Sequence, residues 1–238
     1  GRNYAPFTYI GAPDAERVIV AMGSVTDTIT ETINTLVARG EKVGLIKVYL
    51  YRPFSQKYLE AVLPATVKKI AVLDRAKEVG TREPLFLDVC YALRNHKDIT
   101  FIGGRYGLSS KDTNPSHINA VFEELKKDAP KEEFTIGIED DVTNLSISPI
   151  DIHVDADYTS CLFYGLGSDG TVGANKSTVK IIGNNTDLYS QAYFAYDSKK
   201  AGGVTRSHLR FGPTPIHSPY YINKADFISS SQESYAFK

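Results

Sequence analysis

Short apolar runs alternate with amphipathic stretches through the first 140 residues of the chain. We predict strands at residues 17–21, 43–50, 69–73, 99–102 and 134–138, since each is a short run of β-branched and apolar residues bounded by turn-forming residues. Between these runs, hydrophobic residues recur at helical spacing behind a capping residue or a proline, as they do behind Asn114 and Pro115. Strands that alternate with helices over short loops predict an α/β domain over residues 1–140, with a mostly parallel sheet and flanking helices.

The apolar pattern lapses at residues 139–157, where carboxylates and a proline replace it. The carboxylates are Glu139, Asp140, Asp141, Asp151, Asp155 and Asp157. A calcium site is one interpretation of such a cluster, but the spacing lacks the D-x-D-x-D-G pattern of a calcium loop. We therefore predict an acidic linker over residues 141–155 and no metal site.

The pattern resumes in a second predicted domain over residues 156–238. An apolar run at 161–164 predicts a buried strand, and a glycine-rich turn and a helical pattern follow it. Residues 191–196 and 204–211 predict further strands, and another apolar run begins at residue 225. Because no helix follows that last run, we predict a truncated Rossmann-like βαβ domain.

The glycine-rich turn carries the clearest candidate chemistry in the chain. It reads Gly165-Leu166-Gly167-Ser168-Asp169-Gly170-Thr171, with glycines at G-x-G-x-x-G spacing. Glycines at a strand-to-helix turn let the backbone approach a ligand, and the free N–H groups of a helix start attract a phosphate. A tight turn that binds nothing is the alternative. The preceding strand, the following helix and the nearby hydroxyl groups favour a phosphate-binding loop.

The end of the next predicted strand bears on which nucleotide the loop would hold. Asp197 lies near the position where a nicotinamide-binding βαβ unit has the acid that bonds the ribose hydroxyls. Lys199 and Lys200 follow directly and suit a ribose phosphate better than free hydroxyls. NADP and coenzyme A both carry such a phosphate, so the residues leave these two ligands open. They also leave open that either lysine is an ordinary solvated turn residue.

The composition of the chain bears on several other classes of function and on its location. The net charge of −1 gives no basic field for nucleic acid or an anionic membrane. Two cysteines, Cys90 and Cys161, are too few for an iron–sulfur cluster, which needs about four thiolates. No apolar run approaches the ~20 residues of a membrane span, and the cysteine usage favours a reduced, cytoplasmic compartment. The absence of an initiator Met at Gly1 indicates a piece of a longer protein.

Several stretches resemble the pyruvate:ferredoxin (flavodoxin) oxidoreductase family. They are Gly165–Lys176, Ala195–Gly203, Ser207–Gly212, Val43–Val48, Tyr51–Phe54 and Leu73–Glu78. The resemblance covers essentially the whole chain, and its glycine run is specific to the family. It implies that residues 1–140 form a transketolase C-terminal-like domain. Residues from 156 onward would form the start of the gamma-like domain, which holds coenzyme A.

The resemblance also implies roles for individual residues. Coenzyme A would be contacted by Gly167, Ser168, Asp169, Gly170 and Thr171. Lys199 would contact its phosphates, with Lys200 as the substitute if this placement is off by one residue.

The family enzyme joins pyruvate, coenzyme A and oxidised ferredoxin or flavodoxin into acetyl-CoA, carbon dioxide and the reduced carrier. It uses thiamine diphosphate and 4Fe–4S clusters and is expected to be a homodimer. This chain lacks a cysteine-rich segment and the thiamine-binding domains, so we expect no catalytic residue in it and no activity from it alone. An NADP-binding reductase domain and a non-catalytic assembly scaffold are the alternatives.

Overall fold

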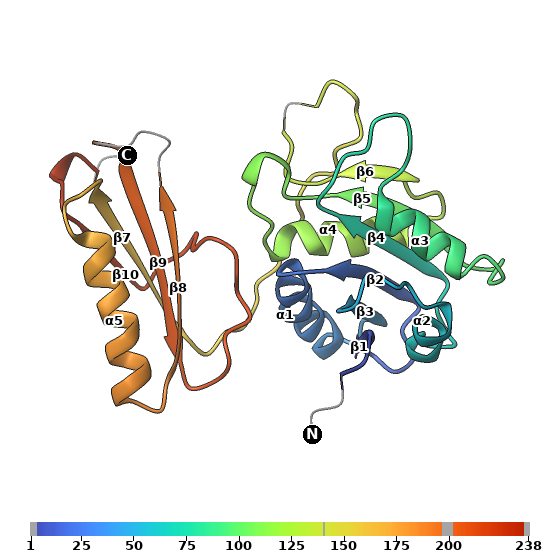
Figure 1. Cartoon of the computed structure of the whole chain (residues 1–238), viewed down its shortest axis with the longest axis horizontal. Helices are drawn as coiled ribbons and strands as arrows, with labels where there is room; N and C mark the ends of the chain where they lie inside the picture. Colours follow the sequence, from blue (N-terminus) through green and yellow to red (C-terminus); the bar gives the residue numbers. More distant parts are fainter. Residues whose placement is uncertain (1–3, 140, 197–201, 236–238) are drawn as a thin grey trace. The chain divides into compact units, whose positions relative to one another are not determined.

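The computed structural model describes residues 4–139, 141–196 and 202–235 (Figure 1). The chain divides into two compact units, residues 1–154 and residues 155–238. Each unit contains one β-sheet, six-stranded in the first and four-stranded in the second.

The sheet of the first unit is mostly parallel, as predicted. Its strands are β1 (Phe7–Gly11), β2 (Arg17–Met22), β3 (Val43–Val48), β4 (Lys69–Asp74), β5 (Thr100–Arg105) and β6 (Glu133–Thr135). They lie in the order β1-β3-β2-β4-β5-β6, and β1 alone of these strands pairs antiparallel to its neighbour. The sequence analysis missed β1. That strand lies at the sheet edge, where it pairs with β3 and buries Phe7 in the core.

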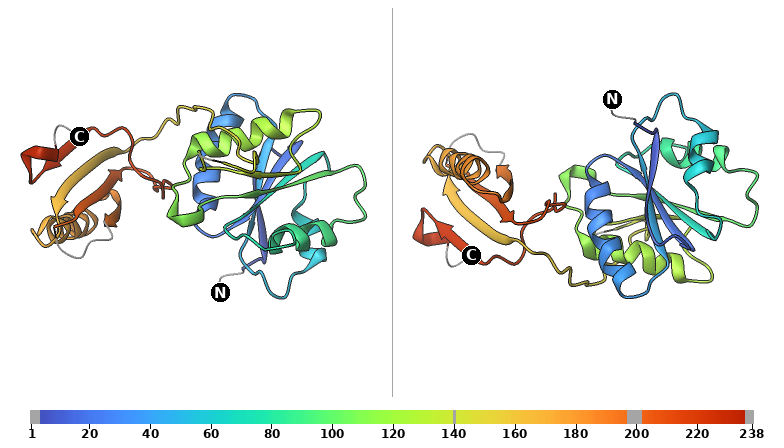
Figure 2. Two further views of the ribbon diagram at one scale, coloured as in Figure 1. Left: turned by 90° about the horizontal axis from the view of Figure 1, so that it is seen from above. Right: turned by 90° about the horizontal axis from the view of Figure 1, so that it is seen from below.

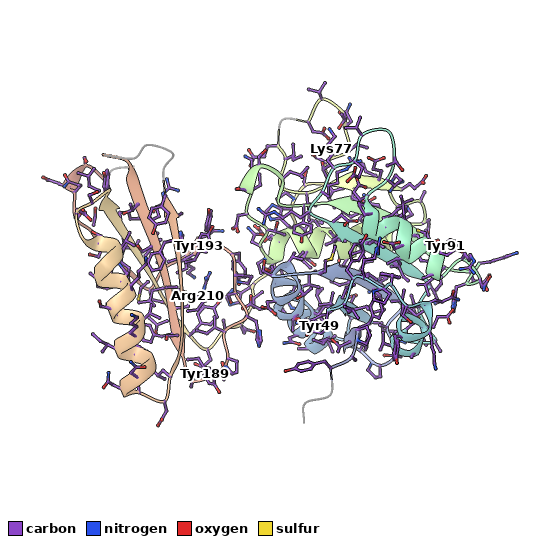
Figure 3. The ribbon with its side chains drawn as sticks, in the orientation of Figure 1. Tyr49, Lys77, Tyr91, Tyr189, Tyr193 and Arg210 are labelled. Carbon is purple, nitrogen blue, oxygen red and sulfur yellow. The ribbon has the colours of Figure 1, made fainter. Side chains whose placement is uncertain are left out.

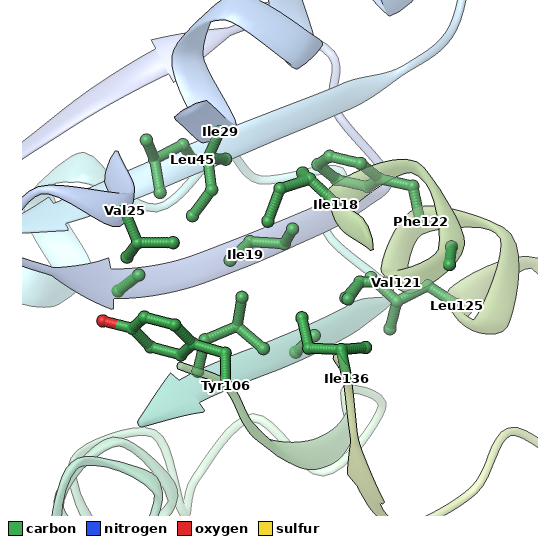
Figure 4. Packing of buried hydrophobic residues seen from close by; sticks show 14 of the residues in the cluster. Ile19, Val25, Ile29, Leu45, Tyr106, Ile118, Val121, Phe122, Leu125 and Ile136 are labelled. Carbon is green, nitrogen blue, oxygen red and sulfur yellow. The ribbon is translucent and has the colours of Figure 1, made fainter. Parts of the chain in front are cut away.

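Helices cover both faces of this sheet (Figure 2). They are α1 (Val25–Ala38), α2 (Gln56–Val62), α3 (Pro84–Ala92) and α4 (Pro115–Lys126), with a short 3₁₀ turn at Leu108–Ser110. Side chains alternate along each strand, so Ile19 of β2 packs with α1 and α4, as Figure 4 shows. Val18 and Val20 point to the opposite face, where α2 and α3 bury Leu59 and Leu85.

The start of α4 shows the local chemistry that makes helix positions predictable. The Asn114 side chain accepts a hydrogen bond from the His117 N–H, and His117 Nδ1 accepts one from the Asn114 N–H. Pro115 occupies the first helical position, where its missing N–H costs nothing. The helix predicted from Asn114 and Pro115 therefore begins where expected.

The segment predicted to be a solvated linker packs instead against the first unit through residue 152. The Thr135 N–H donates to the Leu145 carbonyl, and the Ile147 N–H donates to the Thr135 carbonyl. Ile147 is buried, and Ile152 contacts the same core as α1 and α4. Apolar residues between the carboxylates hold this segment in place. The sequence analysis considered the acidic residues and overlooked these apolar ones.

The second unit contains a sheet with one helix on one of its faces (Figure 1). Its elements are β7 (Thr159–Leu166), α5 (Thr171–Asn185), β8 (Tyr189–Tyr196), β9 (Val204–Gly212) and β10 (Phe227–Ser230), followed by a 3₁₀ turn at Glu233–Tyr235. The strand order is β10-β7-β9-β8. β10 runs parallel to β7, whereas β9 runs antiparallel to both β7 and β8.

The mixed α/β class is thus confirmed, but the second unit departs from a Rossmann-type pair in one respect. The connection β7-α5-β8 is present, yet β9 lies between the two strands that it joins. β9 pairs antiparallel with β8 along one edge and with β7 along the other. The sequence pattern located these strands without showing which edges would meet.

Candidate functional site

The glycine loop joins the end of β7 to the start of α5, as its spacing predicts. A Cβ on Gly165 would lie 2.6 Å from the Thr171 Cβ and 2.9 Å from the Thr205 Oγ1, so only glycine lets the loop pack this closely. Gly170 precedes α5 with a φ of +92°, in the left-handed region that favours glycine. These two glycines fix the shape of the turn.

Asp169 holds the loop in place through its side chain. Its carboxylate accepts hydrogen bonds from the Leu166 N–H (2.8 Å), the Thr171 N–H (2.8 Å) and the Ser231 hydroxyl (2.6 Å). The bond from Ser231, and then those from Thr171, hold the pKa of Asp169 well below its usual range. An anionic side chain in this position repels a phosphate. Any contact of Asp169 with a phosphate therefore falls to its main chain.

A second tie fixes the loop to the neighbouring strand. The Gly167 N–H donates to the Gly203 carbonyl at 2.8 Å, just before β9 begins. Ser168, Asp169 and Gly170 are left exposed as the rim of the loop. Ser168 has a φ of +76°, an uncommon conformation for a residue other than glycine and one that occurs most at functional sites.

Two contacts of this loop were missed by the sequence analysis. Ser231 bonds Asp169 from 62 positions further along the chain, and Gly203 also comes from a different element. No local spacing signals either contact, because both depend on how β9 and β10 flank β7.

Lys199, Lys200 and Asp197 lie outside the described residues, so their predicted roles remain predictions. The flanking strands show where the segment is attached. β8 ends at Tyr196 and β9 begins at Val204, which pairs with Leu166 beside the glycine loop. The end of β8 and the start of β9 therefore lie at the loop end of the sheet.

The first unit gathers buried charges at the carboxyl ends of β4 and β5. Glu83 is fully buried and accepts a hydrogen bond from the Arg105 guanidinium, which also pairs with Glu133. The second carboxylate oxygen of Glu83 has no hydrogen-bond partner. Asp74 lies at the end of β4 and accepts a hydrogen bond from the Phe86 N–H at 3.2 Å. Burial, opposed by this bond and reinforced by Glu83, raises the pKa of Asp74 to about 6.

That shift predicts a pH dependence of stability. Folded Asp74 binds its proton more tightly than unfolded Asp74, so its contribution is fully present below pH ~4 and is lost as pH rises through about 6. Between pH 4 and 7, the free energy of unfolding of the parent should therefore fall relative to that of Asp74→Asn, by up to ~3 kcal/mol. Denaturant titrations at several pH values measure this difference. Parallel pH profiles for the two proteins would contradict the prediction.

Of the two cysteines, Cys90 is half-buried and Cys161 is buried. Cys90 and Cys161 are unpaired thiols, and burial raises the pKa of Cys90 to about 11. Within the described ranges, no three His, Cys, Asp or Glu side chains are grouped so that they could hold a metal ion. Over the same residues, every helix is too short or too polar to cross a membrane.

Two family models match the chain, one on each unit. Residues 15–118 match "Pyruvate:ferredoxin oxidoreductase core domain II", and residues 160–238 match "Pyruvate ferredoxin/flavodoxin oxidoreductase". The pyruvate-flavodoxin oxidoreductase of Enterobacter agglomerans is 58% identical over 243 residues, covering 100% of the chain. The pyruvate:ferredoxin oxidoreductase of Moorella thermoacetica is also 58% identical, over 99% of the chain. The chain belongs to the pyruvate:ferredoxin (flavodoxin) oxidoreductase family.

The chain spans only about a fifth of these oxidoreductases, 21% and 20% of their lengths. A more distant relative, the mitochondrial pyruvate dehydrogenase [NADP(+)] of Euglena gracilis, is 51% identical, and the chain covers 13% of it. Among solved structures, a 2-oxoglutarate:ferredoxin oxidoreductase from Magnetococcus marinus, with 2-oxoglutarate, coenzyme A and succinyl-CoA bound, matches with a TM-score of 0.39. It is 22% identical, and the match covers 51% of this chain and 20% of that one.

Proposed function

We propose that this oxidoreductase chain is part of an enzyme that oxidises pyruvate with coenzyme A to acetyl-CoA and carbon dioxide. Ferredoxin or flavodoxin would take the electrons. The identity of 58% over the whole chain to enzymes named for these reactants supports this proposal. Thiamine diphosphate and the 4Fe–4S clusters would be held by other domains of the same polypeptide, acting as a homodimer in the cytoplasm. Residues 1–140 would supply the transketolase C-terminal-like domain, and residues from 156 the gamma-like domain.

Within this reaction, the chain would bind the phosphates of coenzyme A at its glycine loop. The observation that carries it is the strand–glycine–helix geometry around Gly170, which directs the start of α5 toward an exposed rim. The first N–H groups of a helix lack intrahelical partners, and the helix dipole favours an anion there. Gly167, Ser168, Gly170 and Thr171 would contact the phosphates, and Asp169 would hold the loop in shape. Because the Gly167 N–H already donates to the Gly203 carbonyl and the Thr171 N–H to the Asp169 carboxylate, these two residues would approach the phosphates without donating those N–H groups.

The topology of the second unit weighs against the NADP alternative. In a nicotinamide-binding unit, the strand that ends in the ribose-binding acid lies next to the strand that leads into the glycine loop. Here β9 separates β8 from β7, which puts them ~10 Å apart, since neighbouring strands lie about 4.8 Å apart. β8, which ends at Tyr196, just before Asp197 in the sequence, is therefore displaced from the position that this role requires.

The test of this function is Lys199→Ala in the full-length enzyme. Loss of a charge-assisted contact worth ~1.5–3 kcal/mol should raise the KM for coenzyme A roughly ten- to a hundredfold. Decarboxylation of pyruvate should survive, because that step uses other domains. Lys180→Ala, an exposed lysine on α5, serves as the matched control and should leave the KM unchanged. An unchanged KM in both Lys199→Ala and Lys200→Ala would count against the site.

A further inference from the structure

The strand order of the first sheet reverses between β2 and β4. The chain leaves β2 through α1 to reach β3 on one side, and it returns through α2 to β4 on the other side. The two connecting helices pack on opposite faces of the sheet. In open α/β sheets, ligands bind outside the carboxyl ends of the strands at such a topological switch point. The carboxyl ends of β2 and β4 are therefore the place in the first unit where the topology favours a ligand.

β2 and β4 diverge before either strand ends. Their mutual pairing stops at Val20 and Val72. β2 nevertheless stays paired with β3 as far as Met22, and β4 stays paired with β5 as far as Asp74. The chain enters α1 shortly after β2, so the start of this helix lies beside the point where the two strands separate.

The start of α1 offers hydrogen-bond donors to an anion. Gly23 turns the chain out of β2 with a φ of +80°, and the exposed Ser24 side chain makes no capping hydrogen bond. Among the described residues, neither the Ser24 N–H nor the Val25 N–H has an acceptor. The acid of the first turn, Asp27, is paired with Lys47 at 3.3 Å, which offsets its charge. Unpaired N–H groups and the helix dipole both favour an anion here.

A cation follows β4 directly. Arg75 is exposed, and its Nε donates to the Gly107 carbonyl at 3.1 Å. Within the part of the chain that the structure describes, its guanidinium forms no ion pair. Side chains alternate along β4, so that Leu73 faces the core beneath α1 whereas Asp74 faces α3. The same alternation returns Arg75 to the side of α1, with its terminal nitrogens available to an anion.

The third group at the switch point is a tyrosine hydroxyl. Tyr106 follows β5, is 9% exposed and packs its ring in the same core as Val25. Figure 4 shows its hydroxyl pointing toward the end of β2 and the start of α1. Burial raises the pKa of Tyr106 to about 12, and the Arg75 guanidinium opposes this rise, so the two side chains are close enough to interact. The hydroxyl forms no hydrogen bond with any described residue, although polar groups on buried side chains normally have a partner.

We propose that the switch point of the first unit binds a phosphate group, free or as a monoester, held by the start of α1, the Arg75 guanidinium and the Tyr106 hydroxyl. A phosphate has enough acceptor oxygens for the Ser24 and Val25 N–H groups and the fork of Arg75 together. The same anion gives the Tyr106 hydroxyl the partner that it lacks. This site goes beyond the proposed function, because it lies in the other unit and binds its ligand independently of the glycine loop.

Equilibrium dialysis of the full-length enzyme with radiolabelled inorganic phosphate tests this site. Thiamine diphosphate and coenzyme A, at saturating concentrations, occupy the sites proposed for them. Phosphate should still bind saturably, and Arg75→Gln should weaken its binding roughly tenfold or more, with partial recovery in Arg75→Lys. Tyr106→Phe should weaken binding without lowering the midpoint of thermal unfolding of the phosphate-free enzyme, because the hydroxyl has no partner there.

The matched control is Arg94→Gln, which removes another exposed arginine. Arg94 bonds the Tyr91 carbonyl, and Figure 3 shows Tyr91 well apart from Lys77 on the loop that follows Arg75. This variant should bind phosphate as the parent does. Unlabelled phosphate and glycerol 3-phosphate distinguish the two sources of the ligand, since the natural form should displace the label at the lower concentration.

Three results would overturn the site. They are the loss of saturable phosphate binding once coenzyme A is present, unchanged binding in both Arg75→Gln and Tyr106→Phe, and an equal loss in Arg94→Gln. A loss confined to Arg75→Gln and Tyr106→Phe supports the site even if glycine-loop variants leave coenzyme A binding unchanged. The failure of this proposal and the failure of the proposed function are therefore distinguishable.

Discussion

Replacing Arg105 by methionine should lower the free energy of unfolding of the first unit by about 3–5 kcal/mol. The change leaves Glu83 fully buried as an anion without its partner, and the other oxygen of Glu83 already lacks a hydrogen bond. A weaker ion pair with Arg82 remains, its Nε 4.0 Å from the Glu83 Oε2, and that Nε is buried without a hydrogen bond. When one member of a buried pair is removed, the other keeps its cost of desolvation but loses the attraction that offset it, so the folded state is destabilised.

Denaturant unfolding followed by circular dichroism measures this loss. The double variant Glu83→Leu/Arg105→Met should recover most of it, because apolar side chains then replace both members of the buried pair. Lys68→Met breaks the exposed pair with Glu16 and serves as the control, with an expected change of at most ~1 kcal/mol. A single Arg105→Met variant as stable as that control would show that the buried pair does not hold this end of the sheet together.

Gly170→Val should raise the KM of the full-length enzyme for coenzyme A roughly tenfold or more. Gly170 has a φ of +92°, which a β-branched residue adopts only at a cost of ~1–3 kcal/mol. A Cβ at this position meets nothing within 4 Å, so the effect comes from backbone conformation and not from crowding. The loop would have to change shape, and the N–H groups at the start of α5 would turn from the phosphates.

The matched control for Gly170→Val is Gly183→Ala in the same helix. Gly183 lies near the far end of α5 with an ordinary helical φ, and an added Cβ would be 3.4 Å from the Ser190 hydroxyl. Alanine there should leave the KM for coenzyme A unchanged and stabilise the helix by up to ~1 kcal/mol. Equal KM values for coenzyme A in Gly170→Val, Gly183→Ala and the parent would remove the glycine loop from the site.

The sequence predicted those parts of the fold that local chemistry determines. The alternation of Val18, Ile19 and Val20 placed a strand between two helical layers, and Asn114 with Pro115 marked a helix start. Local sequence patterns do not show which distant strands pair with one another. The insertion of β9 between β7 and β8 has no signal of its own, because it depends on which strand edges meet. The edge strand β1 did have a local signal, the strand-favouring residues Phe7 to Ile10, which the sequence analysis overlooked.

In the candidate site, too, the sequence predicted the features that local chemistry determines and missed those that depend on distant residues. Glycine spacing predicted the turn around Gly165 and Gly170, since a close approach and a left-handed φ both demand glycine. The hydrogen bonds by which Asp169 holds the loop were not foreseen, because one of its donors, Ser231, comes from beyond β10.

The central claim is that the second unit holds coenzyme A at its glycine loop, and a side-by-side titration of the full-length enzyme with coenzyme A and NADP tests it most directly. We expect coenzyme A to bind more tightly than NADP, and Gly170→Val to weaken coenzyme A binding roughly tenfold or more. Tighter binding of NADP, or coenzyme A binding that Gly170→Val leaves unchanged, would contradict the assignment.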